Sequence, residues 1–147
     1  MRLFVFPVLL QVLLAGCVGS SSVPIVVGEK GGLVKSSDEM AKVVIPAMAV
    51  SNKTAITVDR ITDTPYGTVG DAYEFSPDGT RFARPATITI SYDETTLPEG
   101  VDETRLTLGY MVGGRWKAVT DATVDSVANT VTGRSVHFSR FGVFRAG

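Results

Sequence analysis

The feature that most constrains this chain is a two-residue alternation of apolar and hydroxyl-bearing side chains. In residues 87–92, Thr-Ile-Thr-Ile-Ser-Tyr, the isoleucines and the tyrosine fall on one face and the hydroxyls on the other. Because successive side chains of a strand point to opposite faces, such alternation in β-branched residues is typical of a half-buried β-strand. Residues 56–59 repeat the pattern, and in residues 106–112 we expect an apolar face that runs from Leu106 to Val112. No segment keeps a 3.6-residue period, so the sequence predicts an all-β domain.

Turn residues separate these segments at intervals of about ten residues, as in β-sandwiches. Gly113-Gly114 predicts a tight hairpin, because two glycines tolerate positive φ. Residues 76–79, Ser-Pro-Asp-Gly, and residues 125–129 predict two further turns. Residues 36–39, Ser-Ser-Asp-Glu, could cap one helical turn, whereas the apolar residues 43–45 before Pro46 predict a strand. The expected fold is an antiparallel β-sandwich.

The N-terminus predicts export and lipidation. Arg2 precedes an almost wholly apolar run that ends at Leu14, which at about a dozen residues is too short for a lasting membrane span of ~30 Å. The run ends in Leu14-Ala15-Gly16-Cys17, which resembles the lipobox of bacterial lipoproteins. In that family a signal peptidase cleaves before the cysteine, whose thiol carries diacylglycerol. The alternative is an ordinary signal peptide with a stray cysteine.

Cysteine usage agrees with this prediction. Cys17 is the only cysteine, so no intramolecular disulfide can form, and lipidation explains a lone thiol in an exported chain. Two or three acyl chains on one residue would anchor the protein durably in a membrane, because each buried CH₂ contributes ~0.8 kcal/mol to binding. Val18, rather than Asp, follows the cysteine, and by resemblance to enterobacterial sorting we expect the outer membrane. The expected organisation is a signal peptide at 1–16, a lipidated cysteine and tether at 17–23, and a β-sandwich domain at 24–147.

Composition narrows the function classes. With 14 basic and 15 acidic residues the chain has a net charge of −1 and no basic stripe, so we expect no nucleic-acid partner. One histidine and one lipidated cysteine leave almost no ligands for a transition metal, and we expect no cofactor. The acidic loop at 93–103 could offer oxygens to calcium, but its spacing matches no known calcium loop, and we expect a solvated connection. No nucleophile-elbow pattern exists for a serine hydrolase.

Three blocks of the chain together resemble a known family. They include a Gly-Gly-x-Val opening, an Ile-Pro turn, an Ile-Thr-Val strand, a Pro-x-Gly-Thr-x-Phe segment and a closing His-Phe-Ser, which lie at 31–34, 45–49, 56–58, 77–82 and 137–139. In this order they are similar to the ZU-five domain, the β-sandwich shared by zonula occludens proteins, netrin receptors and ankyrins. The resemblance covers about residues 31–144. It implies a β-sandwich that acts as an interaction module, and it carries over no individual binding residues.

The resemblance also implies an alternative function for His137-Phe138-Ser139. In one branch of the family, His-Phe-Ser is a self-cleavage site. There His137 would be the base, Phe138 the acyl donor and Ser139 the nucleophile. In one regular closing strand, His137 and Ser139 would share a face. Val136 and Phe138 would point inward, and a β-bulge near Ser139-Arg140 would let Phe141 and Val143 do so too. The plainer explanation is a strand that only packs the core.

The leading hypothesis is therefore a lipid-anchored, non-enzymatic β-sandwich that meets an envelope or extracellular protein partner. A third hypothesis is a carbohydrate-binding module, in which aromatic rings stack on sugars. The rings considered for that role are those of Trp116, Tyr66, Tyr73 and Tyr92. The sequence predicts neither the partner nor the oligomeric state.

Overall fold

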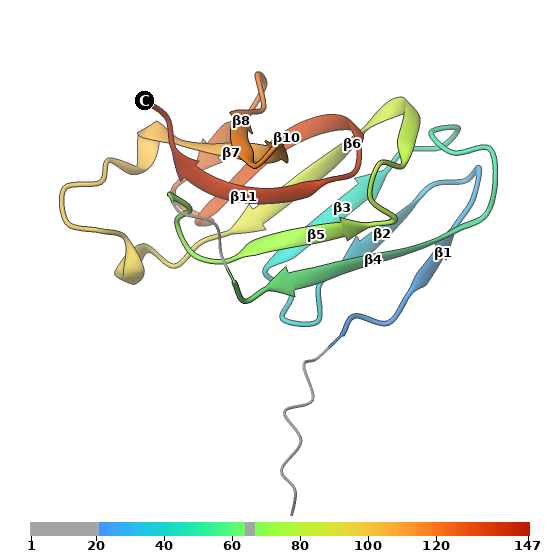
Figure 1. Cartoon of the computed structure of the whole chain (residues 1–147), viewed down its shortest axis with the longest axis horizontal. Helices are drawn as coiled ribbons and strands as arrows, with labels where there is room; N and C mark the ends of the chain where they lie inside the picture. Colours follow the sequence, from blue (N-terminus) through green and yellow to red (C-terminus); the bar gives the residue numbers. More distant parts are fainter. Residues whose placement is uncertain (1–20, 64–66) are drawn as a thin grey trace, which may run out of the picture.

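Two antiparallel β-sheets with an apolar core between them form the fold in the computed structural model, which describes residues 21–63 and 67–147 (Figure 1). The larger sheet has the order β1 (Ile25–Val27), β4 (Thr54–Ile61), β5 (Ala72–Ser76), β11 (Arg140–Arg145), β7 (Leu106–Val112), β8 (Arg115–Ala118). The smaller sheet has the order β2 (Gly32–Lys35), β3 (Ala41–Ile45), β6 (Arg81–Ser91), β10 (Thr130–His137), β9 (Thr123–Asp125). The helical elements of the described chain are two single 3-10 turns, η1 (Glu94–Thr96) and η2 (Glu103–Arg105). The all-β prediction is confirmed.

Side-chain alternation places the predicted strand faces in the core. Ile88, Ile90 and Tyr92 are buried, as are Ile56 and Val58. Burial of such side chains is the main stabilising contribution, at about 1.5–3 kcal/mol for each large apolar group. Both faces of these strands therefore follow the two-residue rule that the sequence shows.

The prediction for β7 is wrong at its end. Val112 is 53% exposed, because the strand runs past the core to its hairpin. On the opposite face, Gly109 is buried because the ring of Phe144 lies over it, and a Cβ at Gly109 would fall 1.8 Å from that ring. This strand thus has apolar cover on both faces in its first half and little cover at its end.

The predicted turns are present where the chain reverses. Gly113 and Gly114 have φ values of 55° and 76°, and Val112 pairs with Arg115 across the hairpin. After β9, Asp125 Oδ1 accepts the N–H groups of Val127 and Ala128, at 3.0 and 2.9 Å. Local turn chemistry is thus confirmed by the structure.

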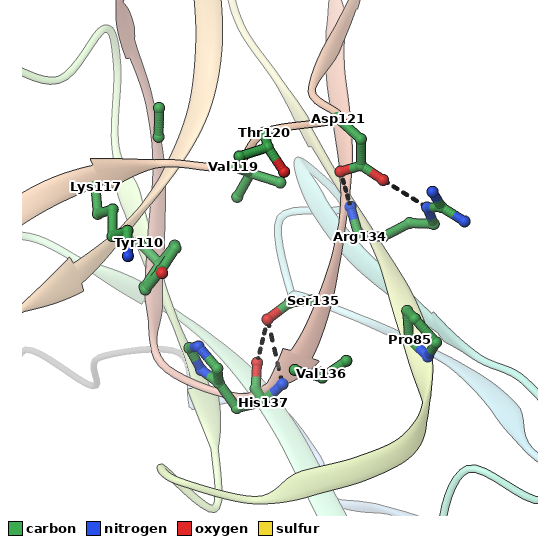
Figure 2. Close-up of a pocket in the computed structure, with 11 residues that line it drawn as sticks. Pro85, Tyr110, Lys117, Val119, Thr120, Asp121, Arg134, Ser135, Val136 and His137 are labelled. Carbon is green, nitrogen blue, oxygen red and sulfur yellow. Dashed lines mark hydrogen bonds and ion pairs between the residues drawn. The ribbon is translucent and has the colours of Figure 1, made fainter.

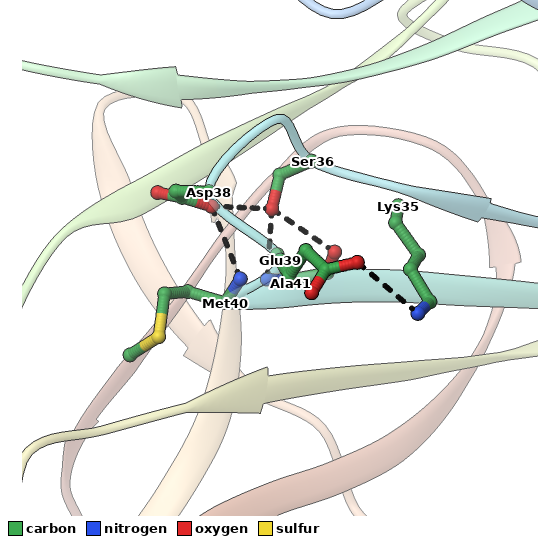
Figure 3. A network of polar contacts seen from close by, with 6 residues as sticks. All are labelled: Lys35, Ser36, Asp38, Glu39, Met40 and Ala41. Atoms are coloured by element: carbon green, nitrogen blue, oxygen red, sulfur yellow. Dashed lines mark hydrogen bonds and ion pairs between the residues drawn. The ribbon is translucent and has the colours of Figure 1, made fainter.

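The expectation of a helical cap at 36–39 is wrong, because these residues form the turn of the β2–β3 hairpin (Figure 3). Ser36 Oγ accepts the N–H of Ala41 at 2.9 Å, and Asp38 Oδ1 accepts the N–H of Met40 at 3.1 Å. The hydroxyl and the carboxylate therefore satisfy the backbone of a hairpin instead of the first turn of a helix.

Two buried tyrosines donate their hydroxyls to carboxylates of neighbouring loops. Tyr73 in β5 donates to Asp38 Oδ2 at 2.9 Å, which links the two sheets, and Tyr92 donates to Glu103 Oε2 at 2.8 Å. Burial and the bond to Asp38 raise the pKa of Tyr73, and burial and the bond to Glu103 raise the pKa of Tyr92 to about 12. Both phenols are therefore neutral in the folded protein across the neutral range.

We expect these phenols to limit stability at alkaline pH. Since their folded pKa values lie above the unfolded value of about 10, their contribution is complete below pH ~10 and is lost as pH rises through the folded values. The free energy of unfolding, measured in urea between pH 8 and 11.5, should fall above pH 10. It should fall less steeply in the Tyr73→Phe, Tyr92→Phe double variant. Parallel curves for the two proteins would contradict this assignment.

The chain changes sheets at residues 138–139, so the prediction of one closing strand is wrong. β10 ends at His137 in the smaller sheet and β11 begins at Arg140 in the larger one (Figure 1). The bulge lies between Ser135 and His137, earlier than predicted, and it leaves Val136 48% exposed. Phe138, Phe141 and Val143 are nevertheless buried, as predicted. The change of sheet, and not a bulge at 139–140, brings these side chains into the core.

The ordered contacts of the domain begin slightly before the predicted boundary at residue 24. Ser22 is buried, its N–H donates to Asp59 Oδ1 at 2.7 Å, and its hydroxyl donates to the carbonyl of Val58. The chain is therefore attached to β4 already at Ser22. Ser22 falls within the predicted tether at 17–23, and Leu14, Ala15, Gly16 and Cys17 lie outside the described residues.

Candidate functional site

A pocket lies at the corner where the chain leaves the smaller sheet (Figure 2). Its volume is about 420 Å³, and β7, β8, β10, β6 and the loop after β8 contribute to its walls. The lining includes Tyr110, Lys117, Asp121, Arg134 and His137. They come from β7, β8, the loop after β8 and β10, so only the tertiary fold brings all of them together.

The pocket is open because strand pairing ends early around it. β9 pairs with β10 only at Thr130–Thr132, and pairing of β10 with β6 is interrupted between Ser135 and His137. Pro85 of β6 lies in that interruption, and a proline has no N–H for the ladder. A space therefore remains beside the last residues of β10.

An aspartate stabilises β10 where β9 no longer reaches it. Asp121 Oδ1 accepts the backbone N–H of Arg134 at 3.1 Å, and its Oδ2 accepts Arg134 Nε at 2.5 Å. These two hydrogen bonds from Arg134 lower the pKa of Asp121 below its usual value. The carboxylate is thus charged at neutral pH, and each of its oxygens accepts one hydrogen bond from Arg134.

A serine holds the irregular end of β10 in place. Ser135 Oγ accepts the N–H of His137 at 3.2 Å and donates to the His137 carbonyl at 2.7 Å. Nearby, Gly133 lets the two sheets approach, because a Cβ there would fall 2.8 Å from a methyl of Val119. The floor of the pocket is therefore firmly connected to the core.

Tyr110, Lys117 and His137 bring a phenol, an ammonium group and an imidazole to the pocket. Tyr110 and Lys117 are directly opposite each other in the β7–β8 pair, so their side chains share a face. The rings of Tyr110 and His137 pack edge to face, with centroids 5.0 Å apart. Within residues 21–63 and 67–147, Lys117 has no ion-pair partner. The pocket therefore carries an uncompensated positive charge.

In the His137-Phe138-Ser139 motif, His137 lines the pocket and Phe138 is buried in the core. The three side chains make separate contacts. Ser139 Oγ donates to the Met111 carbonyl at 3.0 Å, and His137 Nδ1 lies 3.3 Å from the Phe138 carbonyl oxygen. That oxygen also accepts the N–H of Gly79 at 3.2 Å. In this part of the chain no hydrogen bond joins the histidine ring to the serine hydroxyl. The expected base and nucleophile are near in sequence and are not paired.

Of the rings considered for a sugar platform, the three that the structure describes do not form one. Tyr73 and Tyr92 are 3% and 4% exposed, with their hydroxyls bonded to carboxylates, so neither ring can stack on a ligand. Trp116 is half-buried and stacks on Phe144 at 6.1 Å, on the face of the larger sheet away from the core. Tyr66 lies outside the described residues. The three described rings therefore offer little surface on which a carbohydrate could stack.

The described residues offer neither a metal-ligand cluster nor a membrane-spanning helix. Among residues 21–63 and 67–147, no group of three or more His, Cys, Asp or Glu side chains could hold a metal ion. The same residues contain no helix with the length and apolar content to cross a bilayer. The acidic loop at 93–103 uses Asp93 and Asp102 to accept the N–H groups of Thr95 and Thr104. Those carboxylates thus serve local turns.

Sequence reasoning missed most of the pocket. Lys117 follows Trp116 in the strand but points to the opposite face, where the Gly113-Gly114 hairpin places it across from Tyr110, and nothing in the local pattern connects this pair with Arg134. The only pocket residue singled out from the sequence is His137, because it is the single histidine. The predicted Gly113-Gly114 hairpin could have paired Tyr110 with Lys117, whereas the sequence does not show how that hairpin lies against β10.

Fold and site define the chain as an all-β domain of two antiparallel sheets with a basic pocket at one edge. Comparison with known proteins assigns no family to it: no protein-family model matches the sequence, and no curated protein is significantly similar.

Proposed function

We propose that this chain is a lipid-anchored, non-enzymatic module of the bacterial cell envelope that binds a protein partner or serves a structural role there. The observation that carries the proposal is Leu14-Ala15-Gly16-Cys17, placed directly after a short apolar run in a chain with one cysteine. Diacylglycerol on Cys17 would hold the domain at a membrane, which we propose to be the outer membrane. The resemblance of residues 31–144 to the ZU-five domain supports an interaction role.

The arrangement of the strands supports a module that presents its pocket away from the anchor. Ser22 lies beside β2, where it lines a groove with Leu33 and Lys35. β1 and β2 are edge strands of the two sheets, whereas β8 and β9 are the opposite edges. The pocket lies by β8 and β10. A partner could therefore reach the pocket while the other edge faces the membrane.

Intact-mass spectrometry of the chain purified from a bacterial envelope tests this proposal. We expect one species with the mass of residues 17–147 plus acyl groups. The Cys17→Ser variant should carry no acyl mass and should not remain with the membrane fraction. An unmodified Cys17 in the wild-type chain would exclude the lipid anchor.

A second candidate function is self-cleavage of the Phe138–Ser139 bond. It is favoured by the Phe138 carbonyl oxygen, which accepts the N–H of Gly79 and lies 3.3 Å from His137 Nδ1, since donors at a scissile carbonyl stabilise the charge that develops on it. In this reaction Ser139 Oγ bonds to the Phe138 carbonyl carbon, the C–N bond breaks, the Ser139 amine gains a proton, and water opens the ester. The contact of Ser139 Oγ with the Met111 carbonyl makes it the weaker candidate, because a carbonyl is a poor base.

The same mass spectra separate the two candidates. A non-cleaving module gives a single intact chain. Self-cleavage gives two fragments, one that ends at Phe138 and one that begins at Ser139. Fragments should then disappear in Ser139→Ala and persist in Ser126→Ala, which removes an exposed serine in the β9–β10 turn. Fragments with that dependence would replace the non-enzymatic proposal.

A further inference from the structure

We propose that the pocket beside β10 is a carboxylate-binding site that takes a peptide carboxylate, either a C-terminus or an acidic side chain. The inference names the ligand class of the docking module and rests on that proposed function only for its biological role. It follows from the charge, the donors and the open strand pairing of the described residues.

The charge of the pocket is complementary to an anion. Asp121 is the acidic side chain among the lining residues, and both of its oxygens accept from Arg134. That pair is neutral as a whole. Lys117 is exposed, has no ion-pair partner in the described chain and faces the same space. An anionic group in the pocket would supply the missing partner.

The donors converge from three elements. Lys117 in β8 offers an ammonium group, and the hydroxyl of Tyr110 in β7 lies on the same face directly across the strand pair. His137 at the end of β10 packs its ring edge against Tyr110 at 5.0 Å (Figure 2). A carboxylate accepts up to about four hydrogen bonds on two oxygens, so it suits a site with several donors and a positive charge.

The backbone beside the pocket favours a peptide as the source of that carboxylate. β10 extends past the end of β9, and its pairing with β6 is interrupted at Val136. Val136 and Pro85 add apolar surface next to the donors. Because Asp121 already accepts the N–H of Arg134 on this edge, the peptide would be held by its carboxylate at Lys117 and by apolar contact with Val136 and Pro85. The volume of about 420 Å³ suits a few residues and not a large ligand.

Calorimetric titration of the acylated chain in detergent, as purified from the envelope, tests the inference with three short probe peptides. One is N-acetylated with a free C-terminal carboxylate, one is its C-terminal amide, and one is an amide with a single internal glutamate. We expect the first or the third to bind and the plain amide not to bind. The better of the two carboxylate peptides identifies the source. The inference would be overturned if the plain amide bound with equal affinity. It would also be overturned if none of the three peptides bound.

Two matched lysine variants locate the site. Lys117→Gln should weaken binding of the carboxylate peptide about tenfold or more, because hydrogen bonds to charged groups are the stronger ones. Lys30→Gln removes the same charge from an exposed lysine in the β1–β2 turn, at the opposite edge of the sheets, and should leave binding unchanged. Equal weakening in both variants, or none in Lys117→Gln, would contradict the assignment. Inorganic phosphate that binds as well as the peptide would also contradict it.

The outcomes separate this inference from the proposed function. A chain that is acylated and uncut but binds none of the probes refutes the carboxylate site alone. A chain without an acyl group that still binds the carboxylate peptide through Lys117 refutes the anchor alone.

Discussion

Replacing Phe138 with alanine is expected to lower the free energy of unfolding by about 3–5 kcal/mol, as for other fully buried aromatic side chains. Phe138 is 1% exposed and lies between the sheets, with ring centroids 5.8 Å from Phe75 in β5 and 4.8 Å from Phe82 in β6. The substitution would remove both ring contacts and leave a cavity. Against a typical total stability of about 5–15 kcal/mol this is a large loss.

Urea unfolding followed by circular dichroism measures this effect. Val127→Ala is the control, because Val127 is 97% exposed in the β9–β10 turn and its truncation should change stability by no more than about 0.5 kcal/mol. A loss below about 1 kcal/mol for Phe138→Ala would show that the chain does not cross between sheets as described. The expected result would also give the phenylalanine of the His-Phe-Ser motif a packing role, whether or not the bond beside it is cut.

The second large effect is expected at Gly31, which has φ of +72° just before β2. A Cβ there would fall 2.2 Å from the carbonyl oxygen of Ile45 and 2.8 Å from the carbonyl carbon of Pro46. These are backbone atoms, so the clash cannot be relieved by a rotamer change. Gly31→Ala should cost about 1–2 kcal/mol for the left-handed backbone and about 1–3 kcal/mol more for overpacking.

Gly100→Ala is the matched control for this substitution. Gly100 has a similar φ of +79°, but a Cβ there would meet no atom within 4 Å. The control therefore carries the cost of the backbone conformation without the clash. Comparison of the two unfolding midpoints in urea isolates the clash. Equal losses in the two variants would contradict the close approach of the β1–β2 turn to residues 45–47.

Strand faces and turns could be predicted because their signals are local. Ile88 and Ile90 alternate with threonines, and Gly113-Gly114 tolerates the positive φ of a hairpin, so a few neighbouring residues are enough. The turn at 36–39 shows the limit of such reasoning. A serine and an aspartate satisfy backbone N–H groups in a helix cap and in a hairpin alike, and only the pairing of β2 with β3 selects the hairpin.

The site was much harder to predict than the fold. His137 attracted notice as the single histidine, but its partner in the structure is the ring of Tyr110 and not the hydroxyl of Ser139. Parity along one supposed strand placed the bulge at Ser139-Arg140. That parity does not apply, because the strand ends at His137 and the chain continues in the other sheet.

The sequence by itself determined that this chain folds into strands with one apolar side, where most of its turns lie, and that its N-terminus resembles a lipobox. These properties depend on neighbouring residues, whose side-chain period and backbone preferences are local. Only the tertiary structure decided which distant strands pair, that residues 138–139 connect the two sheets, and that the β7–β8 hairpin meets the end of β10 at the pocket. Those contacts depend on the register between strands far apart in sequence, and several registers satisfy the same alternation.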